Sequence, residues 1–259
     1  PAELIRARVR YFKINRGGNQ MKHLFILVFA LLGFTSVFAQ TPLQNAEEFY
    51  RQGKFSAALG LYEYDLKTHP NDPYVYYNIG NCYFKMGSMG LAAANYYRAF
   101  KLAPRDADIR NNLSLALSAG GESLVPAGVP PVLHKAFFSL SYDELKGLAM
   151  VLWWAFCLLA CVWLLKRRDG KITLTAALLL ALTAGWFYLR HKTETEPLAV
   201  EAAPVAEIRS GPGTNFPASA SVAQGHLLTV QDEKDSWYEV IVKSQGIKGW
   251  VNKNAIEQI

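Results

Sequence analysis

Two long apolar runs in the middle of the chain dominate its hydrophobic pattern. Gly147 to Leu165 and Ile172 to Leu189 contain no Asp, Glu, Lys or Arg, and the basic segment Lys166 to Lys171 separates them. At about 1.5 Å per helical residue, each run matches a hydrocarbon core of about 30 Å. The pattern predicts two transmembrane helices at residues 146–165 and 172–189, joined by a turn at 166–171. A buried hairpin in a soluble protein is the alternative, but aromatic side chains occur all round the first run, and a soluble helix usually keeps a polar face.

The charges beside these runs predict their orientation. The turn holds four Lys or Arg residues, whereas the outer flanks hold only scattered ones, so the turn is expected to stay cytoplasmic. The segments 121–145 and 190–196 then connect the hairpin to regions on the opposite side. Ser141 and Glu144 have the spacing of a capping box, which predicts where the first helix begins.

The first forty residues have the pattern of a leader. Residues 1–20 are basic and featureless, so Met21 is the expected true start. A polar beginning, an apolar run and Val37-Phe38-Ala39 then predict a signal peptide at residues 21–39, which would be a third anchor if it were not cleaved. Most of the formal charge of +6 lies in this leader, which excludes a nucleic-acid-binding surface on the rest of the chain.

Residues 40–120 repeat their pattern after 34 residues, a period typical of repeat arrays. The superimposed pairs include Gly53 and Gly87, Tyr62 and Tyr96, and Pro70 and Pro104. The second unit resembles a tetratricopeptide repeat, with Gly80 and Ala92 expected at a close helix crossing. Continuing the shift predicts a closing helix from Asp108 to Ser118.

This resemblance implies a concave groove lined by the first helix of each pair. Aromatic and amide side chains there are expected to bind an extended peptide, because Asn offers both a donor and an acceptor. The candidate groove residues are Tyr50, Arg51, Tyr74, Tyr77, Asn78, Asn81, Phe84, Lys85 and Asn112. The alternative for the three Asn residues is that they satisfy helix ends or face solvent. Asp108 at the far end of the groove argues against a clamp for a peptide carboxylate.

The segments around the apolar runs are less regular. Residues 119–131 are rich in Gly and Pro and predict an extended spacer. Residues 132–140 mix aromatic and basic side chains, which fits either a membrane-interface segment or a plain connector. In the second run Ala177, Ala181 and Gly185 form a face of small residues suited to close packing on the first helix.

From residue 197 the pattern changes to short alternating runs. Strands are predicted at Val205–Ile208, Leu227–Val230, Tyr238–Val242 and Gly249–Val251, and they suggest a small barrel over residues 197–259. The motifs Arg209-Ser210-Gly211-Pro212-Gly213, Trp237-Tyr238-x-Val240 and Gly249-Trp250-Val251 resemble a bacterial SH3 domain. The resemblance implies a groove for cell-wall peptides formed by Arg209, Phe216, Trp237, Tyr238 and Trp250. The alternative is that Trp237 and Trp250 are core residues.

The sequence shows no catalytic pattern. Its five His residues are far apart, none has metal-ligand spacing, and neither a phosphate loop nor a nucleophile elbow occurs. Cys157 and Cys161 lie one helical turn apart, a spacing that strains a disulfide, and Cys82 lies in another region. We therefore expect no enzyme activity, no cofactor and no metal.

The order of these modules resembles the BatE-type proteins of the bacterial aerotolerance operon. The resemblance implies a multi-domain membrane protein: an all-α tetratricopeptide array, a two-helix transmembrane hairpin and an all-β SH3-like barrel. It implies a scaffold in the bacterial inner membrane, with both folded domains in the periplasm. Expected partners are the lipid bilayer, membrane proteins of the von Willebrand factor A type and a MoxR-type ATPase, with no nucleic acid. The alternative is a protein that binds or senses peptidoglycan through the barrel.

Overall fold

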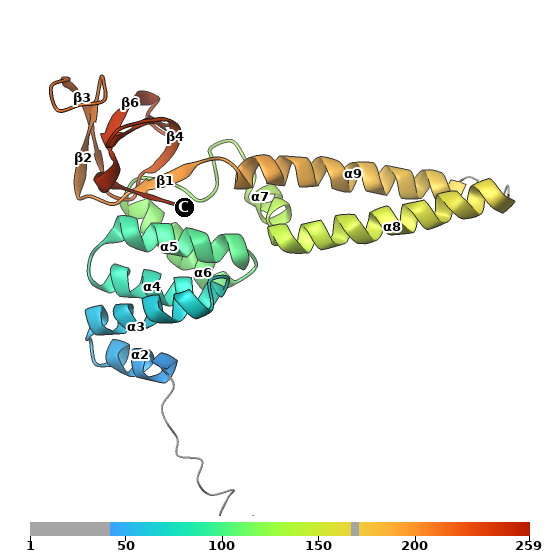
Figure 1. Cartoon of the computed structure of the whole chain (residues 1–259), viewed down its shortest axis with the longest axis horizontal. Coiled ribbons are helices and arrows are strands. Elements are labelled where there is room, and N and C mark those ends of the chain that lie inside the picture. The colour runs from blue at the N-terminus through green and yellow to red at the C-terminus, as the bar shows by residue number, and fades with distance from the viewer. Residues whose placement is uncertain (1–41, 167–170) are drawn as a thin grey trace, which may run out of the picture. The chain divides into compact units, whose positions relative to one another are not determined.

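The computed structural model describes residues 42–166 and 171–259 of the chain. The expected upstream segment, the signal peptide and residues 167–170 of the expected turn lie outside these ranges. Five helices form the first part of the described chain, and each packs on the next (Figure 1). They are α2 (Pro42–Arg51), α3 (Phe55–Thr68), α4 (Pro73–Lys85), α5 (Met89–Leu102) and α6 (Ala107–Ala119). Helix α6 confirms the predicted closing helix.

Glycines occupy the same turn in each repeat unit. Gly53, Gly87 and Gly121 have φ angles of 75°, 80° and 77°, in the left-handed region where a side chain is strained. Each follows the first helix of a unit, so the same turn recurs three times. Gly80 and Ala92 are both buried where α4 packs on α5, and a Cβ on Gly80 would lie 2.6 Å from the ring of Tyr96. The missing side chain makes room for an aromatic ring.

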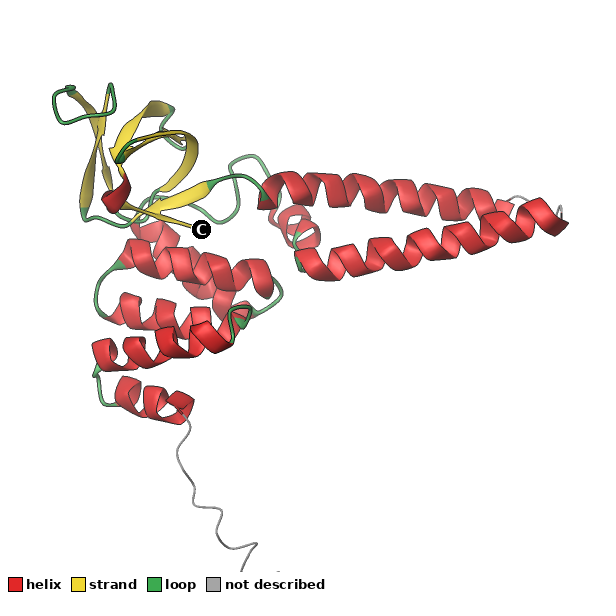
Figure 2. Ribbon diagram, viewed as in Figure 1, coloured by secondary structure: helices red, strands yellow, loops and turns green. Residues whose placement is uncertain are grey.

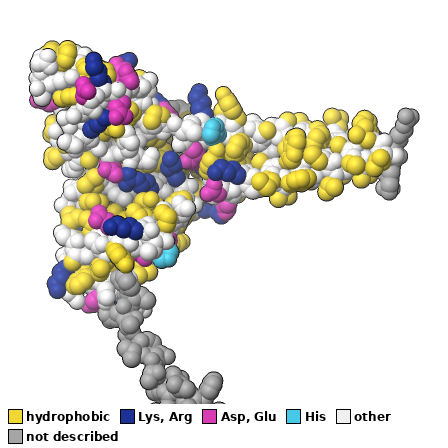
Figure 3. Space-filling model, in the orientation of Figure 1, with side chains coloured by type: hydrophobic (Ala, Val, Ile, Leu, Met, Phe, Trp, Pro, Cys, Tyr) yellow, Lys and Arg dark blue, Asp and Glu magenta, His cyan; other side chains and the backbone are white. Residues whose placement is uncertain are grey.

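The apolar runs form two long helices, α8 (Tyr142–Lys166) and α9 (Lys171–Glu194), which pack along each other. The capping box of α8 is confirmed, since the Ser141 amide donates to Glu144 Oε2 at 2.9 Å and the Glu144 amide donates to Ser141 Oγ at 3.3 Å. Both helices are long and apolar enough to cross a membrane, and the most apolar stretch of each is wholly unburied. Hydrophobic side chains are distributed along the face of the hairpin that Figure 3 shows. This exposure argues against a buried hairpin of a soluble protein.

The small-residue face of α9 does not meet α8 as expected. A Cβ on Gly185 would contact nothing within 4 Å, and Ala181 is exposed. Larger side chains elsewhere on α9 contact α8 where α8 begins and α9 ends. There the rings of Tyr142 and Phe187 stack with centroids 5.4 Å apart.

The C-terminal region is one antiparallel sheet of seven strands in the order β3-β2-β6-β5-β4-β1-β7 (Figure 2). The strands are β1 (Leu198–Glu201), β2 (Val205–Arg209), β3 (Ala218–Ala223), β4 (Leu227–Lys234), β5 (Trp237–Val242), β6 (Ile247–Asn252) and β7 (Ile256–Gln258), with a short 3-10 helix, η1 (Lys253–Ala255), before β7. The four predicted strands are present, and β4 and β6 are longer than predicted.

Three strands were not predicted from the pattern. Strand β3 consists of small residues and is mostly exposed, so it lacks the alternation of a half-buried strand. Strand β1 is almost entirely buried, because one of its faces contacts the helical array: Val200 belongs to the same core as residues of α5 and α6. Strand β7 has only three residues.

The segment between the array and α8 is not the extended spacer that its composition predicts. Leu124 packs on the core of α5 and α6, and Glu122 contacts His226 of the sheet region. A short helix, α7 (Pro131–Phe137), follows, and the Phe138 ring lies 5.2 Å from that of Phe100. Gly and Pro break regular structure here, but the apolar side chains between them still find buried surfaces.

Candidate binding surfaces

The amide-rich face of the helical array is built from three helices. Asn112 of α6 donates through Nδ2 to Tyr77 Oη and to Asn81 Oδ1, both at 3.1 Å. Tyr96 of α5 donates its hydroxyl to the same Asn81 oxygen at 2.8 Å. The 34-residue period places Tyr77 and Asn112 near one another, whereas Tyr96 approaches from behind through the second helix. These four half-buried or buried side chains form one polar network.

This network leaves one amide nitrogen and one amide oxygen available to a ligand. Among the residues that the structure describes, Asn81 Nδ2 and Asn112 Oδ1 have no hydrogen-bond partner, and neither is a fully buried atom without one. One is a donor and the other an acceptor, and the network fixes both side chains. A pre-oriented donor and acceptor side by side match the amide and carbonyl of a peptide backbone.

The other predicted groove residues of α4 differ in exposure. Tyr74 is 57% exposed, and its hydroxyl donates to Asp106 Oδ2 at 3.3 Å, a contact that the sequence reasoning missed. The nearby carboxylate raises the pKa of the Tyr74 hydroxyl. Lys85 is exposed, whereas Asn78 and Phe84 are half-buried and Phe84 packs against the core.

The first repeat unit contributes differently to the groove. Tyr50 is half-buried and its ring packs edge-on against Phe55, with centroids 5.3 Å apart. Arg51 is exposed and paired with Glu48 at 2.7 Å on the same helix. Both positions therefore have partners within their own unit.

The predicted groove residues of the sheet lie on two different faces. Val240 and Val251 belong to the sheet core, so the alternation of β5 and β6 turns Trp237 and Trp250 to the opposite face. The register pairs Trp250 with both Glu239 and Arg209. The two tryptophans are half-buried and lie diagonally across adjacent strands, outside the core cluster, which argues against the alternative that they are core residues.

Tyr238 lies on the inner face and packs against the core instead. The ammonium group of Lys253 lies over its ring, 4.9 Å from the ring centroid, in a cation–π contact. Tyr238 is thus separated from the two tryptophans by the thickness of the sheet.

Arg209 and Phe216 hold the loop after β2 in place. The Arg209 guanidinium donates to the carbonyl oxygens of Thr214 and Phe216 at 3.0 and 2.7 Å, and it is paired with Glu207. A Cβ on Gly211 would lie 2.5 Å from the Phe216 ring, so glycine is required for this fold of the loop. Most of the donor capacity of Arg209 is therefore used within the loop.

The sheet packs on α5, a contact that no local sequence pattern predicts. Arg98 of α5 forms a 2.6 Å ion pair with Glu257 of β7. A Cβ on Gly90 would lie 2.0 Å from the backbone oxygen of Glu201 in β1. The Glu201 side chain is buried, accepts one hydrogen bond from the Ala203 amide at 3.1 Å, and leaves Oε2 without a partner among the described residues. This burial raises the pKa of Glu201 to about 8.

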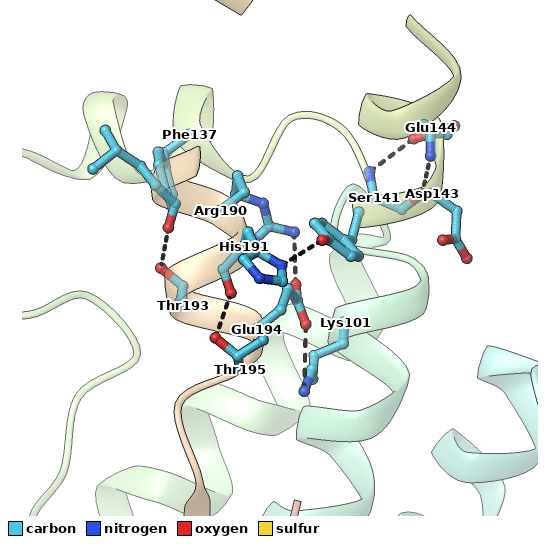
Figure 4. Close-up of polar contacts among 12 residues, drawn as sticks. Lys101, Phe137, Ser141, Asp143, Glu144, Arg190, His191, Thr193, Glu194 and Thr195 are labelled. Carbon is cyan, nitrogen blue, oxygen red and sulfur yellow. Dashed lines mark hydrogen bonds and ion pairs between the residues drawn. The ribbon is translucent and has the colours of Figure 1, made fainter. Parts of the chain in front are cut away.

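A second cluster of charged side chains, drawn in Figure 4, holds the C-terminal end of α9 in place. Arg190 is buried, and its Nη2 lies 3.0 Å from Glu194 Oε1, while Lys101 of α5 lies 3.3 Å from the other Glu194 oxygen. The guanidinium carbon lies 4.4 Å from the centroid of the Phe138 ring, so an aromatic face borders the charge. This cluster connects α9 to the helical array and to the chain just after α7.

No catalytic or metal-binding group stands out in the parts of the chain that the structure describes. No cluster of three or more His, Cys, Asp or Glu residues suited to a metal occurs there. Cys82, Cys157 and Cys161 are free, and burial raises the pKa of the Cys82 thiol to about 11, which leaves little thiolate at neutral pH.

Comparison with known proteins supports the two types of module. Residues 73–106 match the family model "Tetratricopeptide repeat", and residues 204–257 match "Bacterial SH3 domain". The chain is 30% identical over 66 residues to tetratricopeptide repeat protein 16 of Macaca fascicularis and of Homo sapiens, covering 26% of this chain and 8% of each relative. The crystal structure of yeast Tom70 matches 69% of this chain and 31% of its own, with 14% identity and a TM-score of 0.30.

The two family matches agree with the geometry of the residues that they cover. The second helix pair, with its left-handed glycine turn, coincides with the repeat match, and strands β2 to β7 coincide with the SH3 match. The chain thus combines a helical array of the tetratricopeptide type, two apolar helices that are candidates for membrane spans, and a C-terminal antiparallel sheet that matches a bacterial SH3 domain.

Proposed function

We propose that this protein is a non-enzymatic scaffold that α8 and α9 anchor in the bacterial inner membrane. Both folded domains lie in the periplasm, where the helical array binds an extended segment of another envelope protein. The exposed apolar surface of the hairpin supports the anchoring, because so large an apolar area is unfavourable in water. The module order supports partners of the von Willebrand factor A type and a role in aerotolerance.

The observation that carries this proposal is the pair of available amide groups on Asn81 and Asn112. Their hydrogen bonds to Tyr77, Tyr96 and each other hold them in place before any ligand arrives. A pre-oriented pair loses little conformational entropy on binding. The exposed ring of Tyr74 and the ammonium group of Lys85 supply adjacent contacts for side chains of the bound segment.

Crosslinking followed by affinity recovery from native membranes tests the groove. Asn81→Ala removes the amide, and Tyr74→Ala removes the exposed ring. We expect the double variant to lose the partner proteins that the wild-type chain recovers. Tyr64→Ala is the matched control, since Tyr64 is 59% exposed but lies on α3, the second helix of its pair.

A second control separates the loss of the amide from a loss of packing. Tyr96→Phe removes the hydrogen bond behind Asn81 and keeps the amide that faces the groove. Because Asn112 still donates to Asn81 Oδ1 and holds this side chain in place, we expect the variant to keep its partners. Full partner recovery by a folded Asn81→Ala, Tyr74→Ala variant, as judged by circular dichroism, would contradict the proposed groove.

Binding to cell-wall peptides through the sheet is a second candidate function. It is favoured by one observation: Trp237 and Trp250 lie half-exposed on one outer face instead of in the core. Sedimentation of the detergent-solubilised chain with purified peptidoglycan measures this binding, with Trp250→Ala as the variant. Sedimentation that Trp250→Ala abolishes, together with unchanged partner recovery by the groove variant, would favour a wall-binding protein over the scaffold.

A further inference from the structure

A large cavity lies where the helical array, α7, α9 and the sheet meet. Its volume is about 1270 Å³, which exceeds the range of about 300–1,000 Å³ that is usual for small-molecule pockets. Apolar side chains from each of these parts and from the segment after α6 line it, and they include Phe100, Leu124, Phe137, Trp186, Leu198 and Leu227. The apolar part of this wall favours an apolar occupant.

The charged groups on the wall already have partners. Glu122 contacts His226 Nδ1 at 3.0 Å and accepts a hydrogen bond from Ser244 Oγ at 2.5 Å. Glu196 is paired with Lys243. Burial, with the positive charge of Arg110 adding to it, lowers the pKa of His134, which favours its neutral form. These pairs leave little net charge to attract an ion, and they place polar groups on one side of the cavity.

The position of the cavity relative to α9 indicates where its occupant comes from. Trp186 on its wall belongs to the apolar run that ends at Leu189, and its indole Nε1 donates to the Phe137 carbonyl at 3.1 Å. Thr193 and Glu196 on the same wall lie beyond the end of that run. If α9 crosses the bilayer as proposed above, the cavity extends from the depth of the acyl chains to the aqueous surface.

We propose that this cavity holds an acyl chain of a phospholipid from the surrounding bilayer, with the headgroup near Thr193 and Glu196. Acyl chains are the apolar groups present at high concentration at the depth of Trp186. An acyl chain in the cavity removes the apolar surfaces of Leu124, Leu198 and Leu227 from water, while the chain itself only exchanges one apolar environment for another. This site is distinct from the peptide groove and from the tryptophan face of the sheet.

Photolabelling of the full chain in vesicles tests this site. The vesicles contain phosphatidylethanolamine, phosphatidylglycerol and a trace of phosphatidylcholine with a diazirine at the end of one acyl chain. After irradiation, mass spectrometry locates the label. We expect it on α8 and α9, as for any membrane span, and also on Leu124, Leu198 or Leu227, which lie outside both helices.

Two variants of α7 show whether the cavity itself binds the chain. Ala136 lines the cavity, and Ala136→Trp fills part of it, whereas Val132 is 77% exposed and is not on the cavity wall, so Val132→Trp is the matched control. We expect the label on Leu124, Leu198 and Leu227 to be lost in Ala136→Trp and kept in Val132→Trp.

The wild-type measurement tests the site even if Ala136→Trp does not fold. Label on α8 and α9 without label at the cavity residues would overturn the acyl-chain site and leave the membrane anchor intact. Label at the cavity residues that persists in a folded Ala136→Trp variant would have the same meaning. An absence of label on α8 and α9 as well would refute the anchor and, with it, the site.

Discussion

The buried carboxyl of Glu201 predicts an unusual pH dependence of stability. Glu201 lies between the sheet and α5, and its pKa of about 8 compares with 4.5 for an ordinary Glu side chain. Between these two values the folded chain binds one proton more than the unfolded chain. The free energy of unfolding therefore falls as pH rises, by about 1.4 kcal/mol per pH unit. At pH 7 the loss relative to pH 4.5 amounts to roughly 3 kcal/mol.

Glu201→Gln removes this titration while keeping the size and neutral charge of the protonated acid. The Gln carbonyl oxygen can still accept the hydrogen bond from the Ala203 amide. We expect little difference between variant and wild type at pH 4.5, and a variant that is more stable by roughly 3 kcal/mol at pH 7. The difference grows further up to pH 8, where the folded wild-type protein loses its proton.

Thermal unfolding of the full chain in detergent, followed by circular dichroism from pH 4.5 to pH 8, measures this effect. Hydrogen exchange of the β1 amides shows whether the change is located at the boundary with α5. Glu207→Gln is the control, because Glu207 is an exposed carboxylate whose ion pair with Arg209 contributes little. Wild-type and Glu201→Gln curves that run parallel over the whole pH range would refute the reasoning.

The remaining predictions concern the sheet boundary and the membrane topology. Gly90→Ala is expected to destabilise the full chain by about 1–3 kcal/mol, because the new Cβ collides with backbone atoms of Glu201. Gly60→Ala in α3, where a Cβ meets nothing within 4 Å, is the control and should stabilise by about 0.5–1 kcal/mol in the same thermal assay. Equal effects would show that α5 and β1 are not in close contact. For the topology, reporter fusions are placed at Gly120, Gly170 and Ile259. We expect them to report periplasm, cytoplasm and periplasm in that order, and a cytoplasmic signal at Ile259 would contradict the topology.

The features that the sequence predicts well are those in which neighbouring residues determine the structure. The 34-residue period predicts the recurring helix pair, and the structure places a left-handed turn at Gly53, Gly87 and Gly121, the same position of each unit. The capping box of Ser141 and Glu144 is likewise a contact within one helical turn. Four strands follow from local alternation of apolar and polar residues.

The features that escaped prediction depend on residues far apart in the chain. Strand β1 has its second buried face only because α5 covers it, and neither Gly90 nor Glu201 carries a pattern that announces this contact. An acidic residue at the end of a short strand indicates a solvent-exposed position, yet Glu201 is buried. Within the candidate groove, the period correctly brings Asn112 near Tyr77. It does not reveal that Tyr96 holds Asn81 from behind.

The short strand β1 is also the first part of the sheet that a pull along the chain from α9 would load. It begins at Leu198, soon after α9 ends at Glu194, and pairs with β4 and β7 on its two sides. Its hydrogen bonds are perpendicular to the strand, so a pull along the chain between hairpin and sheet loads them together in shear instead of opening them one after another. If the hairpin is the proposed membrane anchor, tension on the sheet would thus reach it through a strand that is hydrogen-bonded on both edges.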